Sequence, residues 1–195
     1  ENSHDYPAEP RQIRRGVDLG VFSVLSHGLT HLSTHVDRWL QAKDRYRNMK
    51  WYREFREMGT GIQVDETILQ QLMQTSRKVL RPALAHAPRT LVPSAPAQAM
   101  QILDIARRAA FAVCSSRTTF ILGEKNFANR KIKAFYPSEM TAAKSYCEAG
   151  FPVIFTFHDY DIYQHGVQWL QTQIEQLKKW GVKRFVSLEF LAALL

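Results

Sequence analysis

Two histidines four residues apart, His27 and His31, are the first residues whose type and spacing could do chemistry. A protein-bound metal is held by neutral imidazoles that converge on one point within about 2 Å. Histidines at this spacing can converge on a helical turn, or in a tight loop where Gly28 lets the backbone fold back. The pattern therefore predicts a metal site, and the open alternative is a solvated loop whose histidines only make hydrogen bonds. His35 repeats the spacing, but it lies in polar, helix-forming sequence, and we expect it at the surface.

A second group of candidate residues follows the apolar run "VIFTF" (153–157), which predicts a buried strand. His158 comes directly after this run, with Asp159 and Asp161 behind it. A carboxylate beside an imidazole can fix its tautomer and raise its basicity, as a general acid or base requires. His158 is thus a candidate proton donor, and the alternative is that the two aspartates only cap the next turn.

Short apolar strands alternate with helices along most of the chain. We expect strands at 21–25, 111–115, 132–136, 153–157 and 184–188, and helices at 9–19, 65–79, 97–109, 139–149 and 166–180. The stretch "RTLVPSAP" (89–96) predicts a further short strand that ends in a proline turn. Strands that are apolar throughout are buried on both faces, which is typical of a parallel sheet or a (β/α) barrel. In such folds the functional site lies at the carboxyl ends of the strands. Because His27, Pro93 and His158 each fall just past such an end, the fold should bring them to one side.

The composition is that of an ordinary globular domain. Of the 195 residues, 45% are hydrophobic and 23% are charged, which argues against wholesale disorder. The sequence has no apolar run long enough to span a membrane, and it does not open on an export signal. The net charge of +8 favours polyanionic neighbours, such as nucleic acid, anionic glycans or an acidic surface. Cys114 and Cys147 lack metal-ligand spacing and are expected to be buried free thiols.

The stretch 36–89 interrupts the strand–helix rhythm. Its first part is densely charged and carries four aromatic side chains among arginines and lysines: Trp39, Tyr46, Trp51 and Phe55. One interpretation is a basic helix that stacks these rings on nucleic acid. The other is a helix that packs the rings inward and solvates its basic face. We adopt the second interpretation and expect 36–89 to be a peripheral helical insertion.

Together the two histidine clusters resemble the polysaccharide deacetylase family, whose catalytic domain is a distorted (β/α) barrel. The stretch "QIRRGVDLGVFSVLSHGLTHLS" is similar to the family's helix, strand and histidine-x-x-x-histidine metal motif. "VIFTFHDYD" resembles its apolar strand ending in leucine-x-histidine, with Thr156 where leucine is usual. "RTLVPSAP" resembles a proline-bearing strand between these motifs, with Val92 in place of the usual arginine. The resemblance covers roughly 9–35 and 90–195, and it ends on "WGVKRFVSL" followed by a helix.

This resemblance implies a metal-dependent hydrolase that removes acetyl groups from a polysaccharide or related glycan. It implies that His27 and His31 bind a divalent metal, with zinc as the expected ion, and that His158 is the catalytic acid. It also implies an exported or envelope-associated protein. The family's first strand carries an Asp-Asp pair that supplies the base and a third metal ligand, and Asp5 does not match it because no strand precedes it. We therefore expect 1–195 to be a single deacetylase-like domain that is either N-terminally incomplete or has lost this motif.

Two other functions remain open from the sequence. The chain could be a non-catalytic glycan-binding or scaffold domain that kept the fold with a degenerate site. It could also be a basic nucleic-acid-binding domain that uses a helix over 38–56. Metal content separates the deacetylase from both, and salt-dependent binding to DNA would single out the nucleic-acid binder.

Overall fold

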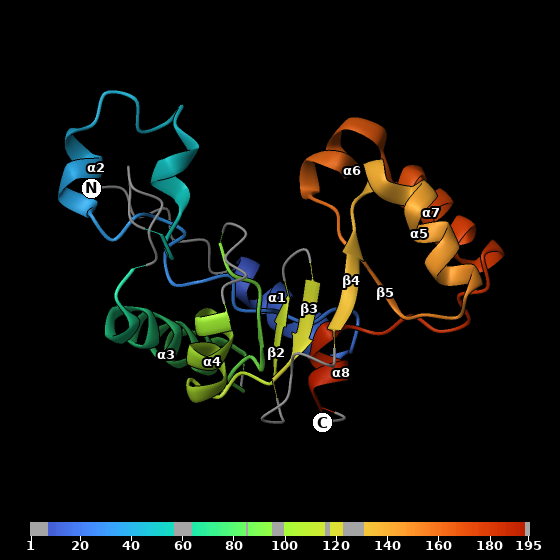
Figure 1. The fold of residues 1–195 in the computed structure, drawn as a ribbon, viewed down its shortest axis with the longest axis horizontal. Coiled ribbons are helices and arrows are strands. Elements are labelled where there is room, and N and C mark those ends of the chain that lie inside the picture. Colours follow the sequence, from blue (N-terminus) through green and yellow to red (C-terminus); the bar gives the residue numbers. More distant parts are fainter. Residues whose placement is uncertain are drawn as a thin grey trace.

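The computed structural model describes residues 8–56, 64–84, 86–94, 100–115, 118–122 and 131–193 (Figure 1). Within these residues, the strands form one five-stranded mixed sheet in the order β1-β2-β3-β4-β5. Their bounds are β1 Thr90–Leu91, β2 Val113–Ser115, β3 Thr118–Ile121, β4 Lys131–Phe135 and β5 Val153–Phe155. The expected strands at 111–115 and 153–157 are therefore present in shortened form, and the strand expected at 132–136 is present one residue earlier.

Most of the sheet runs in one direction. The pairs β1–β2 and β4–β5 are parallel, and β3 is antiparallel to both of its neighbours. Ser26 forms a single parallel bridge to Leu91, so the chain just before His27 lies along the outer side of β1. It follows that the Ser26 segment, β1, β2, β4 and β5 all end at the same edge of the sheet.

The expectation of a (β/α) barrel is wrong. The sheet is open within the described part of the chain, because β1 and β5 lie at opposite ends of the strand order. Residues 184–188 form no strand there, and the expected strand at 21–25 is reduced to the Ser26 bridge. The reversed strand β3 also breaks the barrel pattern. Only two residues separate β2 from β3, and a parallel connection needs a dozen or more, so this pair can only be a hairpin.

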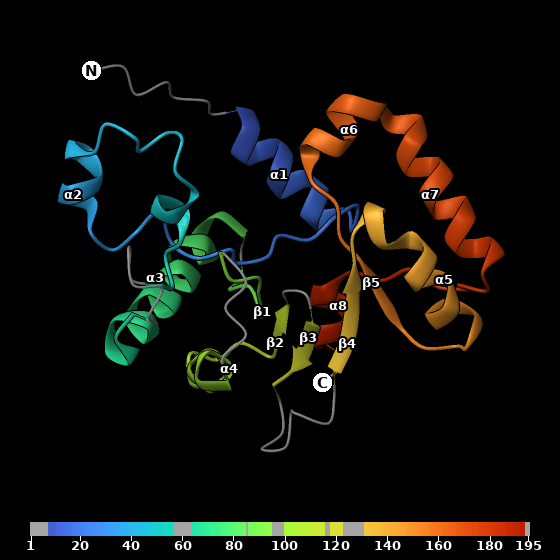
Figure 2. The same cartoon turned by 45° about the horizontal axis from the view of Figure 1, so that its top comes forward.

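The helices mostly follow the expected pattern. Their bounds are α1 Ala8–Asp18, α2 Val36–Gln41, α3 Glu66–Leu84, α4 Met100–Arg108, α5 Met140–Glu148, α6 Asp159–His165, α7 Val167–Lys179 and α8 Leu188–Ala193, with short 3-10 helices η1 Met49–Tyr52 and η3 Pro137–Glu139. The helix α6 was not expected, and the single helix expected in the first part of 36–89 is replaced by α2 and η1. Figures 1 and 2 show α3 and α4 beside the β1 end of the sheet, and α5 and α7 beside the β5 end.

The main hydrophobic core lies on the β1–β3 side. Its buried side chains come from the stretch after η1, from α3, α4 and the strands, and from residues next to them: Phe55, Val64, Leu69, Met73, Leu91, Ile102, Leu103, Ile105, Ala106, Ala109, Phe111, Cys114 and Leu122. Phe55, Leu69 and Met73 are fully buried, and each side chain of this size stabilises the fold by about 1.5–3 kcal/mol. The segment 36–89 therefore supplies part of the core, and the expectation that it is peripheral is wrong.

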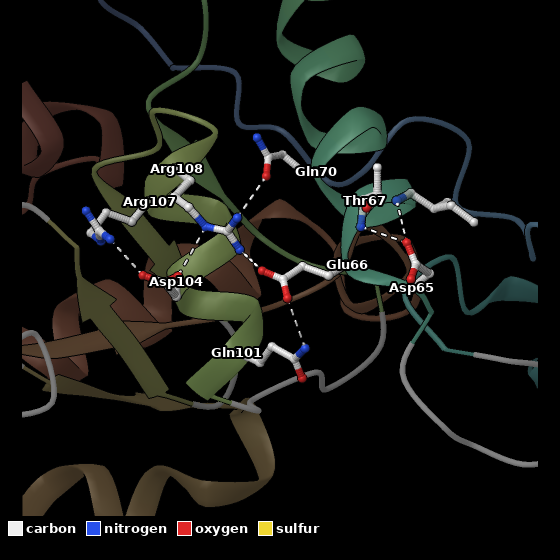
Figure 3. Close-up of polar contacts among 9 residues, drawn as sticks. Asp65, Glu66, Thr67, Gln70, Gln101, Asp104, Arg107 and Arg108 are labelled. Atoms are coloured by element: carbon white, nitrogen blue, oxygen red, sulfur yellow. Dashed lines mark hydrogen bonds and ion pairs between the residues drawn. The ribbon is translucent and has the colours of Figure 1, made fainter.

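Polar contacts on the surface fix α3 against α4 (Figure 3). Arg108 of α4 forms an ion pair with Glu66 of α3, and its guanidinium also donates to Gln70 and Asp104. These side chains are about 40% exposed, so each pair contributes little to stability, and the buried apolar residues carry the packing. Cys114 and Cys147 are both buried and free, as expected, and burial raises the pKa of the Cys114 thiol to about 12.

Candidate functional site

The loop that carries His27 and His31 begins where the Ser26 bridge ends. The backbone N–H of Ser26 donates to the Thr90 carbonyl at 3.0 Å, and the N–H of Val92 donates to the Ser26 carbonyl at 2.7 Å. The Ser26 hydroxyl is fully buried and shares a hydrogen bond of 2.7 Å with the Ser76 hydroxyl of α3. These contacts anchor the loop to both β1 and the core helix.

A buried carboxylate lies inside this loop. Glu54 is 0% exposed, and its carboxylate accepts from the backbone N–H groups of Leu29 at 2.9 Å, Thr30 at 3.3 Å and His31 at 3.1 Å. A carboxylate removed from water needs such donors, because an unsatisfied buried charge is strongly destabilising. Glu54 therefore determines the path of the backbone between the two histidines.

Gly28 is required where the loop passes Glu54. Its φ of +114° belongs to the region that favours glycine, and a Cβ at this position would lie 2.1 Å from Glu54 Oε2. The Ser76 hydroxyl donates to the Gly28 carbonyl at 2.7 Å, which holds this peptide from the other side. His31 also has a positive φ of 57°, a conformation that is uncommon outside glycine. The backbone is thus folded back between the histidines, as the sequence suggested for a chelating loop.

The two imidazoles lie side by side, with ring centroids 4.7 Å apart. His27 Nδ1 lies 2.6 Å from the Val92 carbonyl oxygen. Because a carbonyl only accepts, Nδ1 carries the proton and Nε2 keeps its lone pair. Nδ1 of His31 is buried and has no hydrogen-bond partner in the part of the chain that the structure describes. Each ring therefore has a nitrogen suited to a metal ion, and a carbonyl that orients the other nitrogen is a common second contact of such ligands.

Electrostatics keeps His27 in the neutral form that a metal ligand needs. The His27 side chain is partly exposed, but the burial of the rest of its imidazole lowers its pKa. The positive charges of His31 and His158 lower this pKa further. The Val92 carbonyl and the Glu54 carboxylate oppose this shift, but the net direction is downward. His158 is thus close enough for its charge to act on His27, although the two lie 131 positions apart in the sequence.

His158 leaves the sheet after β5 and has a more open environment. Its side chain is 49% exposed, and it lines a cavity of about 460 Å³. Asp161 accepts from the His158 backbone N–H at 2.7 Å, and its Oδ2 lies 3.9 Å from His158 Nδ1. Asp161 therefore caps α6, as the alternative interpretation held, and it also places a carboxylate beside the imidazole.

The other sequence candidates lie outside this group. Pro93 is buried two residues after β1, at the same edge of the sheet. His35 is partly buried and precedes α2 as its N-cap residue. The aromatic residues proposed for a nucleic-acid helix pack on their own neighbours. Trp51 is 5% exposed and donates to Asp44, and Arg45 lies over the rings of Trp39 and Tyr46.

Two imidazoles are the candidate metal ligands of this loop. The rings of His27 and His31 lie side by side, with centroids 4.7 Å apart, and Nδ1 of His31 has no hydrogen-bond partner among the described residues. Among the described residues there is no group of three or more histidines, cysteines, aspartates and glutamates that could hold a metal ion. Glu54 does not add a third ligand to this set, because its two oxygens already accept from the loop amides.

Sequence reasoning missed three residues of this site: Glu54, Tyr136 and Tyr160. Glu54 lies in a densely charged stretch, so its position in the sequence does not distinguish it from the other charged residues there. Its contacts with the histidine loop are to residues 23 to 25 positions away. Tyr136 ends the β4 run and Tyr160 follows His158, so their position after two parallel strands was the available signal.

Comparison of the chain with protein-family models, with curated proteins and with solved structures found no match. None of the helices in the described ranges is both long and apolar enough to cross a membrane.

Proposed function

We propose that this chain is a metal-dependent hydrolase that removes acetyl groups from a polysaccharide or related glycan. One observation carries the proposal. Two paired imidazoles and a third, half-exposed imidazole come from distant parts of the sequence to the same edge of a sheet. The polysaccharide deacetylase resemblance of both histidine segments supports the same reaction.

His27 and His31 are proposed to hold a divalent metal, with zinc as the expected ion. Bound there, zinc would supply Lewis acidity that polarises an acetyl carbonyl. The two rings contribute nitrogens that are already oriented, one by the Val92 carbonyl and one by the Glu54-bound backbone of His31. Little reorganisation is then needed when the ion binds.

His158 is proposed to be the catalytic acid. Hydrolysis adds water to the acetyl group and releases acetate, so the sugar nitrogen or oxygen that leaves must receive a proton. The His158 ring is exposed enough to exchange protons with water, and the Asp161 carboxylate lies 3.9 Å from its Nδ1. As a proton donor it must not be a metal ligand, because a coordinated nitrogen has no proton to give.

A second candidate function is a non-catalytic glycan-binding or scaffold domain with a degenerate site. It is favoured by the finding that the described residues contain no group of three or more histidines, cysteines, aspartates and glutamates that could hold a metal ion. Nucleic-acid binding has less support, because α2 and η1 do not form the continuous basic helix that it required, and Trp51 is buried.

Metal binding and acetate release together test the proposal. The protein is equilibrated with zinc, excess ion is removed, and bound zinc is measured. We expect bound zinc to be lost in the His27→Ala, His31→Ala double variant and to persist in His158→Ala. His165→Ala, in an exposed residue of α6, is the matched control. Unchanged zinc content in the double variant would overturn the metal site.

Acetate released from an acetylated oligosaccharide then separates the two candidate functions. The hydrolase releases acetate only when zinc is present. A protein that binds the oligosaccharide and releases no acetate is the glycan-binding domain.

A further inference from the structure

The cavity beside His158 is built by the ends of two parallel strands. Its volume is about 460 Å³, and it is lined by residues that follow β4 and β5: Tyr136, Pro137, Ser138, His158, Tyr160 and Asp161. This volume lies within the range of about 300–1,000 Å³ of small-molecule sites. Because β4 and β5 are parallel, both sets of residues leave the sheet at the edge that also carries His27.

Three rings in this cavity are nearly parallel. The His158 ring lies 4.8 Å from the Tyr160 ring at an interplanar angle of 10°, and 6.0 Å from the Tyr136 ring at 13°. Tyr160 remains 52% exposed even though His158 covers part of it. Burying a tyrosine face is favourable, and an exposed aromatic residue in a cavity is a site where a ligand gains energy.

The polar groups of the cavity determine what can cover this ring. Asp161 Oδ2 accepts from the backbone N–H of His158. Because a carboxylate has about four acceptor positions, Asp161 can still accept hydrogen bonds from hydroxyl groups. Ser138 adds an exposed hydroxyl that both donates and accepts. The Asp161 carboxylate is the acidic group among the residues that line the cavity, so it repels a phosphate or another anion.

We propose that this cavity binds one neutral pyranose ring of a glycan, with the sugar stacked on Tyr160 and its hydroxyls bonded to Asp161 and Ser138. A pyranose has one face of C–H groups, which carry partial positive charge and are attracted to the negative face of an aromatic ring. Its hydroxyls are donors that a carboxylate accepts. A ring held here lies next to His158, so the subsite would position the group that leaves. The inference rests on the proposed function, since it assigns the sugar side of that same site.

The binding test uses the full chain without metal, so that it does not depend on the metal site. Chitotetraose is titrated into the chelator-treated protein, and binding is measured by calorimetry or by chemical-shift changes. We expect Tyr160→Ala to weaken binding by about tenfold or more, the scale of losing one stacked ring. Tyr160→Phe, which keeps the aromatic face, should bind within about threefold of the unchanged protein. Tyr163→Ala is the matched control, because Tyr163 lies on the same helix, is 91% exposed and does not line the cavity.

Several results would overturn this subsite. They are no binding of chitotetraose, equal binding by Tyr160→Ala, or binding of adenosine in its place with the same dependence on Tyr160. The outcome is separable from that of the proposed function. Sugar binding that survives in His27→Ala, His31→Ala without any acetate release supports the subsite and rejects the hydrolase. Acetate release that does not change in Tyr160→Ala supports the hydrolase and rejects the subsite.

Discussion

The loop that carries His27 and His31 and the loop that carries His158 lie at the same edge of the sheet, but different parts of the chain hold them. In each, a carboxylate accepts from the backbone, from three N–H groups in the first loop and from one in the second. In the first loop that carboxylate is Glu54, which is 0% exposed and comes from 23 to 25 residues away. In the second it is Asp161, whose side chain is 17% exposed and lies three residues away.

This difference matches the two roles that we propose. A metal ligand benefits from a rigid, partly desolvated position, because its geometry must be right before the ion arrives. A general acid must exchange protons with water between turnovers, so an open position suits it. The comparison predicts that changes in the two loops have different consequences, which the following experiments separate.

The largest expected effect is on turnover, and it comes from a change in the loop that carries His158. His158→Ala should lower the rate of acetate release by about 10²–10⁴, the usual worth of general acid catalysis. Its zinc content should not change, because His158 is not a proposed ligand. Rates are measured with zinc at saturation for the variant and for the His165→Ala control. Loss of zinc from His158→Ala would mean that the two loops do not divide the roles as proposed.

A change in the loop that carries His27 and His31 should have its largest effect on the stability of the fold. Glu54→Ala leaves the Leu29, Thr30 and His31 amides without their buried acceptor. Each lost hydrogen bond to a charged group costs about 1.5–3 kcal/mol, so we expect a loss of about 3 kcal/mol or more in the free energy of unfolding. Urea unfolding of the metal-free protein measures it.

The matched control for this experiment is Glu148→Ala. Glu148 is also a glutamate, but its side chain is 53% exposed in a surface pair with Lys144. Its removal should change stability by less than about 0.5 kcal/mol. Gly28→Ala gives an independent check, because its Cβ would displace the Glu54 carboxylate without removing it. If both Glu54→Ala and Gly28→Ala unfold like the unchanged protein, Glu54 does not hold the loop.

The contrast between local and distant contacts also explains what the sequence could predict. Both histidine clusters are recognisable because spacing, Gly28 and the apolar run before His158 are local signals. Asp161 as a cap is local too, and the sequence offered it as an alternative. The contact of Glu54 with residues 29–31 is not a local signal, because it depends on how 36–56 folds back. That stretch was expected to be one helix.

The fold shows the same limit. Apolar runs predicted β2, β4, β5 and most helices, because burial is encoded in the residues themselves. The barrel was wrong because closure depends on which distant strands pair, and strand direction depends on connection length. The reversed strand β3 could have been found from the two residues that separate it from β2, since "TTFI" (118–121) has strand character.

Amide hydrogen exchange should sharpen the comparison at single residues. The N–H groups of Leu29 and His31 donate to a fully buried carboxylate, whereas that of His158 donates to a partly exposed one. We expect the first two to exchange at least about tenfold more slowly, because only a larger opening of the structure exposes them. The core helix α3, with Leu69 and Met73 fully buried, should be protected as well. Faster exchange at 29–31 than at His158 would contradict the rigid loop.

The smallest effect is expected in the pH dependence of stability. Burial, together with the charges of His31 and His158, lowers the pKa of His27 in the folded protein, while the unfolded chain has an ordinary histidine pKa of about 6.5. Below that value the unfolded chain binds more protons at this position than the folded one. The contribution of His27 to stability is therefore fully present above about pH 6.5 and is lost as the pH falls through the folded pKa. His27→Gln removes this proton linkage, so its free energy of unfolding should fall less between about pH 8 and about pH 5.5 than that of the unchanged protein. Chemical unfolding of both metal-free proteins at the two pH values measures the difference. An equal or steeper fall in His27→Gln would show that the folded loop does not favour neutral His27, which the proposed metal ligand requires.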